Sequence, residues 1–117
     1  MPQTSLNARD ELVERLRERL AQEPVTREIA MFGGRAFMVD EKMAVCALKS
    51  GDLLVRVDAD EHEELLATPG AETAEMGVGR TMGPGWIAVT AESIDDDEVL
   101  TFWCEKAIEY NRKVTGR

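Results

Sequence analysis

Aromatic residues and cysteines are scarce in this sequence. Its 117 residues include three Phe, two Trp and one Tyr, so the hydrophobic core must consist mainly of Leu, Val, Ile, Ala and six Met. The two cysteines, Cys46 and Cys104, lie far apart and lack the CxxC spacing of many metal and redox sites. This pattern excludes a disulfide framework and predicts two small buried thiols in a reducing compartment.

Long hydrophobic runs are absent as well. No window approaches the roughly 20 apolar residues that a membrane-spanning helix requires, and the N-terminus lacks the apolar run of a signal peptide. We therefore expect a cytoplasmic protein with no membrane segment. The length, together with 44% hydrophobic and 32% charged residues, is typical of a single globular domain, here residues 1–117.

Positive charge is in short supply. The chain has 14 Lys and Arg against 23 Asp and Glu, which gives a net charge of −9, and residues 58–75 carry seven carboxylates and no Lys or Arg. Proteins that bind nucleic acid gain affinity by neutralising phosphates with basic side chains, and an acidic surface repels the phosphate backbone. The composition therefore argues against direct binding of DNA or RNA and is typical of solvated acidic helix faces.

Groups that could perform catalysis or bind a metal are few. His62 is the single histidine, and the acids beside it on a helix point in different directions, whereas a metal needs several converging ligands. No Ser or Cys has an evident base partner. We therefore expect a solvated His62, no catalytic residue, no metal site and no cofactor, in a protein that is not an enzyme.

What the sequence does contain is a clear change of hydrophobic period. Apolar residues at helical spacing predict a first helix over residues 5–22, which Pro24 ends. From Val25 the period becomes two, and short links between apolar segments predict an antiparallel meander with strands over 25–31, 35–39, 43–48 and 53–57. A short helix over 58–67, strands over 72–76 and 86–90, and a last helix ending near residue 114 follow.

The order of these elements indicates the fold class. Helix, three or four strands, helix, two strands and a final helix predict an α+β domain, a two-layer sandwich with helices packed on an antiparallel sheet. The last helix has two competing caps, Ser93 with Asp96 and Asp95 with Glu98. Its predicted apolar stripe consists of Val99, Trp103, Ala107, Tyr110 and Val114.

The adjacent glycines Gly33 and Gly34 follow one apolar extended segment and precede another. A phosphate-binding loop would require a helix directly after the glycines, with its N-terminus facing the anion. A hairpin turn instead requires positive φ angles, which glycine adopts readily. Because a second strand follows, the hairpin turn is the favoured interpretation.

A second glycine-rich segment runs from Gly77 to Gly85. Gly79 and Arg80 could bind an anion through backbone N–H groups and a guanidinium, although a long hairpin or surface loop is the favoured interpretation. Arg56 interrupts an apolar strand, either facing outward or buried and paired with Asp58 or Asp40. The candidate binding residues are Arg35, Arg56, Gly79, Arg80 and Trp86.

Segment 43–48 is apolar at every position. Such a run is typical of a central strand, or of a strand that a partner chain covers. With no nucleophile and base pair in the sequence, we expect a protein-interaction or regulatory domain whose partner is a second copy or another protein, bound at a sheet edge or face. The alternative is a small-molecule or anion-binding domain that uses the 77–85 loop and nearby arginines.

Five segments together resemble the TfoX N-terminal-domain family, also called Sxy-like proteins. In order and spacing they are MFGGRAFMVDEKMAVCAL, LLVRVD, EELLATPGAE, GRTMGPGWIAV and FWCEKAIEY. MGPGW has one residue more than the family's usual Met, any residue, Gly and aromatic. The resemblance extends from about Met31 to Tyr110, which is most of the chain.

The resemblance implies a two-layer α+β fold of the secretion-chaperone-like type. It also implies a cytoplasmic regulator of DNA-uptake competence that acts together with other transcription machinery, and it brings no catalytic motif. Many members carry a second, C-terminal domain, and we expect that domain to be absent from this chain.

Overall fold

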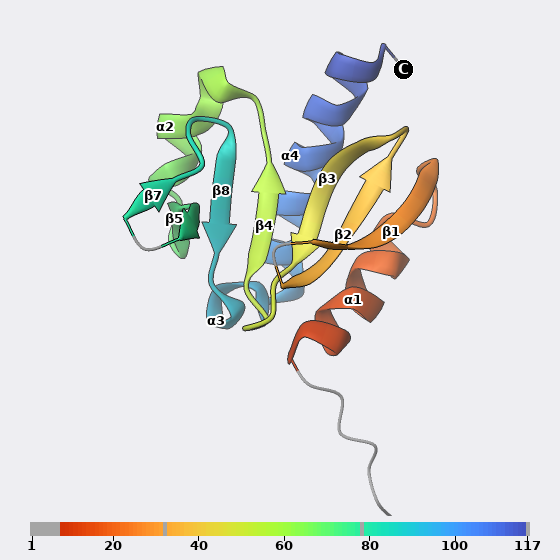
Figure 1. Ribbon diagram of the computed structural model, residues 1–117, viewed down its shortest axis with the longest axis horizontal. Coiled ribbons are helices and arrows are strands. Elements are labelled where there is room, and N and C mark those ends of the chain that lie inside the picture. Colours follow the sequence, from red (N-terminus) through yellow and green to blue (C-terminus); the bar gives the residue numbers. More distant parts are fainter. Residues whose placement is uncertain (1–7, 32, 78, 117) are drawn as a thin grey trace, which may run out of the picture.

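The computed structural model describes residues 8–31, 33–77 and 79–116. Six strands form one antiparallel sheet in the order β1-β2-β3-β4-β8-β5, and helices α1 (Ala8–Arg19) and α4 (Asp97–Thr115) pack on one of its faces (Figure 1). In the view of Figure 1 these helices lie behind the sheet, so the reader looks onto the opposite face. The predicted α+β class, with helices packed on an antiparallel sheet, is confirmed.

The predicted meander forms the larger part of this sheet. Its strands are β1 (Val25–Met31), β2 (Gly34–Val39), β3 (Lys42–Ala47) and β4 (Leu53–Arg56), each antiparallel to the next. Strand β3 lies between β2 and β4, so the fully apolar segment is an inner strand, as expected. Strand β4 also pairs with β8 (Trp86–Val89), and β5 (Ala71–Thr73) forms the far edge.

The glycine pair lies at the turn between β1 and β2. Met31 pairs with Gly34, and Gly33, whose φ is 75°, lies in the turn between them. Phe32 lies outside the described residues. Gly34 is instead the first residue of β2, where a Cβ would stand 1.8 Å from the carbonyl oxygen of Ala47. The hairpin prediction is confirmed, with one glycine used for the turn and the other for a close strand contact.

The segment predicted as a strand over 72–76 divides into two short strands. Strand β5 joins the main sheet, whereas β6 (Glu75–Gly77) pairs with β7 (Arg80–Thr81) in a separate two-stranded sheet. Between them Ala74 is 2% exposed. The 77–85 segment therefore contains part of a hairpin, in line with its favoured interpretation, and its Met82 packs with Ala74 against the main sheet.

The predicted helix over 58–67 and the last helix each consist of two parts. The first comprises a 3-10 turn, η1 (Ala59–Glu61), and α2 (His62–Leu66); the last comprises α3 (Ala91–Ile94) and α4. The predicted caps of the last helix were wrong in detail, because Thr90 caps α3 and Asp96 caps α4. The Asp96 carboxylate accepts hydrogen bonds from the backbone N–H groups of Glu98 and Val99.

The buried face of α4 also differs from the predicted stripe. Its buried residues are Leu100, Trp103, Cys104, Ala107, Ile108 and Asn111, whereas Val114 is 44% exposed. The two stripes share Trp103 and Ala107, and the helix turns the aliphatic side chains of Leu100 and Ile108 toward the core. Asn111 belongs to this face because its side-chain amide donates a hydrogen bond to the carbonyl oxygen of Val39, at 2.9 Å.

The apolar residues form two clusters, one on each side of the sheet. The main cluster lies between the sheet and helices α1 and α4. The second cluster lies on the opposite face, which we call the open face; it consists of Ala36, Cys46, Leu54 and Ala74, with Ile29, Met31, Met43, Leu48, Met82, Trp86 and Ala88 half-buried around them. Helices α1 and α4 pack against the main cluster, and of the open-face side chains Met43 and Trp86 also lie beside residues of α4.

Candidate functional site

Two of the predicted binding residues meet where β4 ends and β8 begins. Arg56 and Trp86 are register partners on these adjacent strands. The guanidinium carbon of Arg56 lies 4.6 Å from the centroid of the Trp86 ring and 5.4 Å from that of Tyr110, on α4. Both distances are within the range of cation–π attraction. Tyr110 belongs to the predicted apolar stripe of the last helix, and no local sequence signal indicates a contact with a strand residue so far away.

A pocket of about 340 Å³ opens beside Arg56. The β3–β4 ladder extends only as far as the Val45–Val55 pair, and beyond it the two strands separate in front of α4 (Figure 1). The residues around the resulting hollow, which we call the Arg56 pocket, are Lys42, Met43, Arg56, Trp86, Ala107, Tyr110, Asn111 and Val114. No carboxylate of the described residues lines it.

Gly85 shapes one wall of this region. It is buried with a φ of 93°, and a Cβ there would lie 2.6 Å from Arg56 Nη1 and 2.9 Å from the carbonyl oxygen of Val57. Its N–H donates to Nδ1 of His62 at 3.0 Å, and its carbonyl oxygen accepts from the N–H of Val57 at 2.8 Å. His62, predicted to be solvated, therefore accepts a hydrogen bond that holds the end of the 77–85 segment.

The other predicted binding residues lie elsewhere. Arg35, on β2, has its guanidinium 4.0 Å from the carboxylate of Glu28. Gly79 and Arg80 are exposed in the β6–β7 hairpin, and a Cβ at Gly79 would meet nothing within 4 Å. None of the three lines the Arg56 pocket.

Acidic residues near Arg56 in the sequence or beside the pocket form ion pairs with other side chains. Asp58, one proposed partner, accepts from Lys113 Nζ at 2.5 Å, and this hydrogen bond holds the pKa of its carboxyl below the usual value. Most Lys and Arg side chains in the described part of the chain have a carboxylate within 4.0 Å; the exceptions are Lys42, Lys49, Arg56 and Arg80. Arg56 thus contacts two aromatic rings, whereas the sequence left open an outward-facing side chain or a carboxylate partner.

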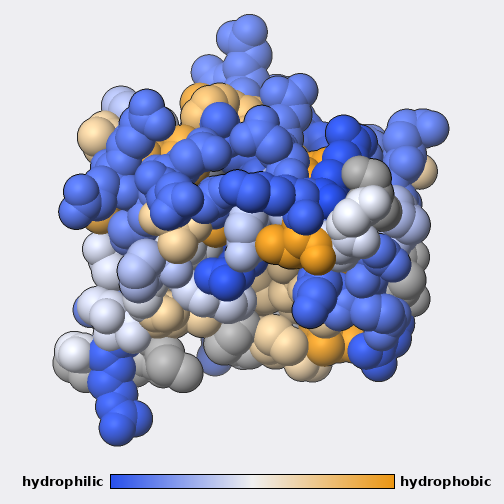
Figure 2. All heavy atoms as spheres, turned by 90° about the horizontal axis from the view of Figure 1, so that it is seen from above, coloured by the Kyte–Doolittle hydropathy of each residue, from blue (hydrophilic) through white to orange (hydrophobic). Residues whose placement is uncertain are grey.

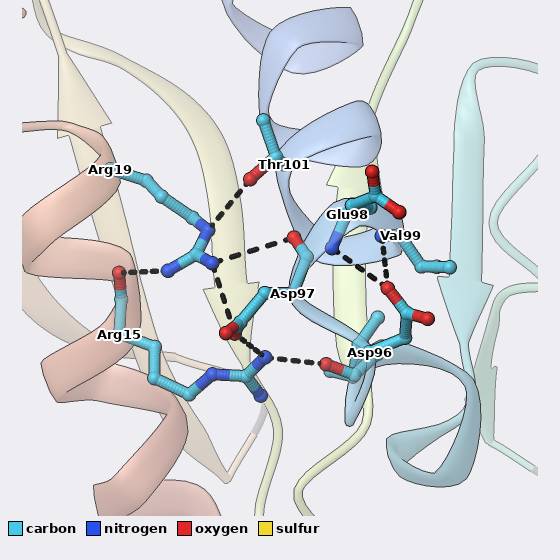
Figure 3. A network of polar contacts seen from close by, with 8 residues as sticks. Arg15, Arg19, Asp96, Asp97, Glu98, Val99 and Thr101 are labelled. Carbon is cyan, nitrogen blue, oxygen red and sulfur yellow. Dashed lines mark hydrogen bonds and ion pairs between the residues drawn. The ribbon is translucent and has the colours of Figure 1, made fainter.

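Ion pairs with a structural role join α1 to the start of α4 (Figure 3). Arg15 Nη2 donates to the carbonyl oxygen of Ile94 at 2.7 Å and to Oδ1 of Asp97 at 2.8 Å, and Arg19 reaches the same carboxylate at 3.1 Å. The hydrogen bond from Arg15 is the main cause that lowers the pKa of Asp97. These contacts fix the helix layer and leave the Arg56 pocket untouched.

A second hollow, of about 770 Å³, crosses the open face. Its apolar floor includes Leu54 of β4 and Ala88 of β8, which are register partners. Lys49, in the turn between β3 and β4, lies on one side, and Glu72 of β5 and Glu75 of β6 lie on the other. We call this hollow the open-face groove.

Both thiols are buried and unpaired. Burial raises the pKa of Cys46 to about 11 and that of Cys104 to about 12, so both remain protonated at neutral pH and are poor nucleophiles. In the described ranges no group of three His, Cys, Asp or Glu side chains could hold a metal ion. No helix among the described residues is both long and apolar enough to cross a membrane.

Six antiparallel strands with helices on one face and an apolar opposite face define a small two-layer α+β domain. A sequence model of the TfoX N-terminal domain matches residues 18–110, and the chain belongs to this family. The matched segment includes the open face and most of the Arg56 pocket. Comparison with curated proteins and with solved structures found no match.

Proposed function

We propose that this protein is a non-enzymatic, cytoplasmic protein-interaction domain with a regulatory role, and that it self-associates through the open face. Membership of the TfoX N-terminal domain family supports a regulatory role, since the named members that the sequence resembles regulate DNA-uptake competence. Two buried thiols with raised pKa values, and a single histidine whose Nδ1 is used by a backbone N–H, support a function without catalysis.

The observation that carries this proposal is the composition of the open face. Its cluster consists of eleven apolar residues, four of them buried and seven half-buried around them. Exposed apolar surface costs roughly 25 cal/mol per Å² relative to burial, and large contiguous patches of it mark interaction sites on soluble proteins. A partner that covers this face would remove the half-buried side chains from water.

The sheet edges are less suited to binding than the face. Edge strand β1 has a register irregularity between Val25 and Arg27, and its exposed residue Arg27 is charged. The other edge strand, β5, has only three residues. Bulged, charged or short edges resist the addition of a further strand, so the face is the favoured surface.

A second copy of the chain fits this surface by charge. Each copy carries a net charge of −9, and two copies repel each other except where carboxylates are sparse, as over the apolar cluster. Lys49 lies on one side of the groove, Glu72 and Glu75 on the other, and no ion pair joins them to other described residues. In a two-fold dimer each side of one groove can meet the opposite side of its partner's.

Charge exchange across the groove tests the proposal. K49E alone, and E72K combined with E75K, should each shift the protein from dimer to monomer in sedimentation velocity, because like charges would then face each other twice. An equimolar mixture of the two variants should restore a dimer, because both contacts again join opposite charges. Neither change alters the apolar floor, so folding should be retained.

Phe102→Glu provides a matched control. Phe102 is 37% exposed on α4, outside the open face, and its replacement should leave the dimer intact. Met82→Glu, within the open face, should abolish it. A mixture of charge variants that stays monomeric would show that the two copies do not meet across this groove, and an equal loss in both glutamate variants would remove the open face from the account.

A further inference from the structure

We infer that the Arg56 pocket binds the phosphate group of a small molecule. This site shares no lining residue with the open-face groove, although Met43 and Trp86 also belong to the open-face cluster. The inference does not depend on self-association. It rests on unpaired positive charge, on the free hydrogen-bonding edge of a guanidinium, and on the size and lining of the hollow.

The Arg56 pocket holds two cations that have no carboxylate partner among the described residues. In a chain with 23 acidic and 14 basic residues, nine of the thirteen described Lys and Arg side chains have a carboxylate within 4.0 Å. Lys42 and Arg56 do not, and both line the same pocket, which contains no carboxylate. The nearby acids are engaged elsewhere: Asp58 with Lys113, and Glu41 with Arg27 at 3.1 Å. The pocket is therefore a local concentration of positive charge on an acidic protein.

The N–H groups of the Arg56 guanidinium are available as hydrogen-bond donors. A guanidinium interacts with aromatic rings through its flat faces, and its N–H groups lie in the plane between them. The ring centroids of Trp86 and Tyr110 lie 4.6 and 5.4 Å from the guanidinium carbon. Within the described part of the chain, the guanidinium N–H groups have no hydrogen-bond acceptor. A planar, half-buried donor set of this kind matches the paired oxygens of an oxyanion.

The size and the lining of the Arg56 pocket fit a small phosphate ester. At about 340 Å³ the hollow is at the low end of ligand-binding pockets, which suits one phosphate with a small organic body. Met43, Ala107 and Val114 offer apolar contacts to that body. Two cations favour a phosphate dianion over a single carboxylate.

The surroundings argue against a polymeric phosphate. Seen from the end of the molecule at which β4 ends and β8 begins, hydrophilic side chains dominate the surface and hydrophobic ones show only between them (Figure 2). With a net charge of −9, a nucleic acid that placed one phosphate in the pocket would place its neighbours over an acidic surface. A small phosphate ester meets the pocket alone.

The test is an NMR titration with inorganic phosphate, phenyl phosphate and acetate at constant ionic strength. The expected result is saturable shifts of the Trp86 indole N–H, the Arg56 side-chain N–H and the Tyr110 backbone amide. Phenyl phosphate should bind more tightly than inorganic phosphate, and acetate most weakly. Arg56→Gln should weaken phosphate binding by about tenfold or more, since hydrogen bonds to charged groups are worth about 1.5–3 kcal/mol.

Arg80→Gln is the matched control, because Arg80 is also an unpaired arginine but lies outside the pocket; it should bind phosphate as the unaltered protein does. Thermal melting establishes that Arg56→Gln is folded. If it is not, Lys42→Gln, at an exposed position, replaces it and should weaken binding several-fold. Equal affinity in the pocket variant and in Arg80→Gln, or no localised shift up to about 10 mM phosphate, would overturn the inference.

Discussion

Gly85 lies directly before strand β8 and beside Arg56, the residue for which the Arg56 pocket is named. Its positive φ favours glycine, and its missing side chain leaves room for the guanidinium of Arg56 and the carbonyl oxygen of Val57. Gly83 has nearly the same φ, 94°, but a Cβ there would meet nothing within 4 Å. A comparison of substitutions at the two glycines therefore distinguishes the cost of the left-handed backbone conformation from the cost of a close contact.

Gly83→Ala should lower the free energy of unfolding by about 1–2 kcal/mol, the cost of a left-handed conformation for a residue with a Cβ. Gly85→Ala should lower it by more, because its Cβ also displaces Arg56. Urea denaturation measures both values. Equal losses in the two variants would contradict the close contact assigned to Gly85.

Arg56 illustrates what a single residue in a sequence can reveal. Its position inside an apolar strand predicted an unusual environment, and Arg56 and Trp86 were both named as candidates. Their contact depends on the pairing of β4 with β8, and the contact of Arg56 with Tyr110 depends on the rotation of α4. Neither follows from local sequence, so neither interpretation of Arg56, outward-facing or paired with a carboxylate, included the aromatic contacts, and Tyr110 and Lys42 were missed.

At the scale of elements, hydrophobic period placed the meander strands to within a residue or two. Helix caps were harder, because residues 95–98 are all acidic and each could accept a hydrogen bond from a helix N-terminus. In the structure Asp96 is the cap of α4. Helix α1 contacts the residues around it, since Arg15 binds both the carbonyl oxygen of Ile94 and the carboxylate of Asp97. Tertiary contacts of this kind are not visible in the local pattern.

The α1–α4 contact predicts a specific dependence of stability on pH. The pKa of Asp97 is lowered in the folded protein, from a usual value of 3.8, chiefly by its hydrogen bond from Arg15. The stability it contributes is therefore present above about pH 4 and is lost as the pH falls through the folded pKa. Asp97→Asn should lower the melting temperature slightly at pH 7, and the difference from the unaltered protein should close below about pH 4.

Asp95→Asn is the control for this prediction, because Asp95 is exposed and has no ion pair with another described residue. It should change the melting temperature little across the same pH range. A difference for Asp97→Asn that persisted unchanged into strong acid would mean that the ion pair is not its cause.

At the scale of the whole molecule, the two faces of one sheet differ in what covers them. Helices α1 and α4 bury one face, and the open face keeps half-buried apolar residues. The sequence predicted helices on the sheet, but a strand that is apolar on every residue does not say whether a helix or a partner covers each side. That distinction required the three-dimensional arrangement.

Self-association through the open face is the central claim, and the molar mass in solution tests it most directly. Light scattering coupled to size-exclusion chromatography, at high micromolar concentration, should give twice the 13.0 kDa of one chain. The Met82→Glu variant should give the mass of one chain under the same conditions. A single species of 13.0 kDa for the unaltered protein would contradict the account.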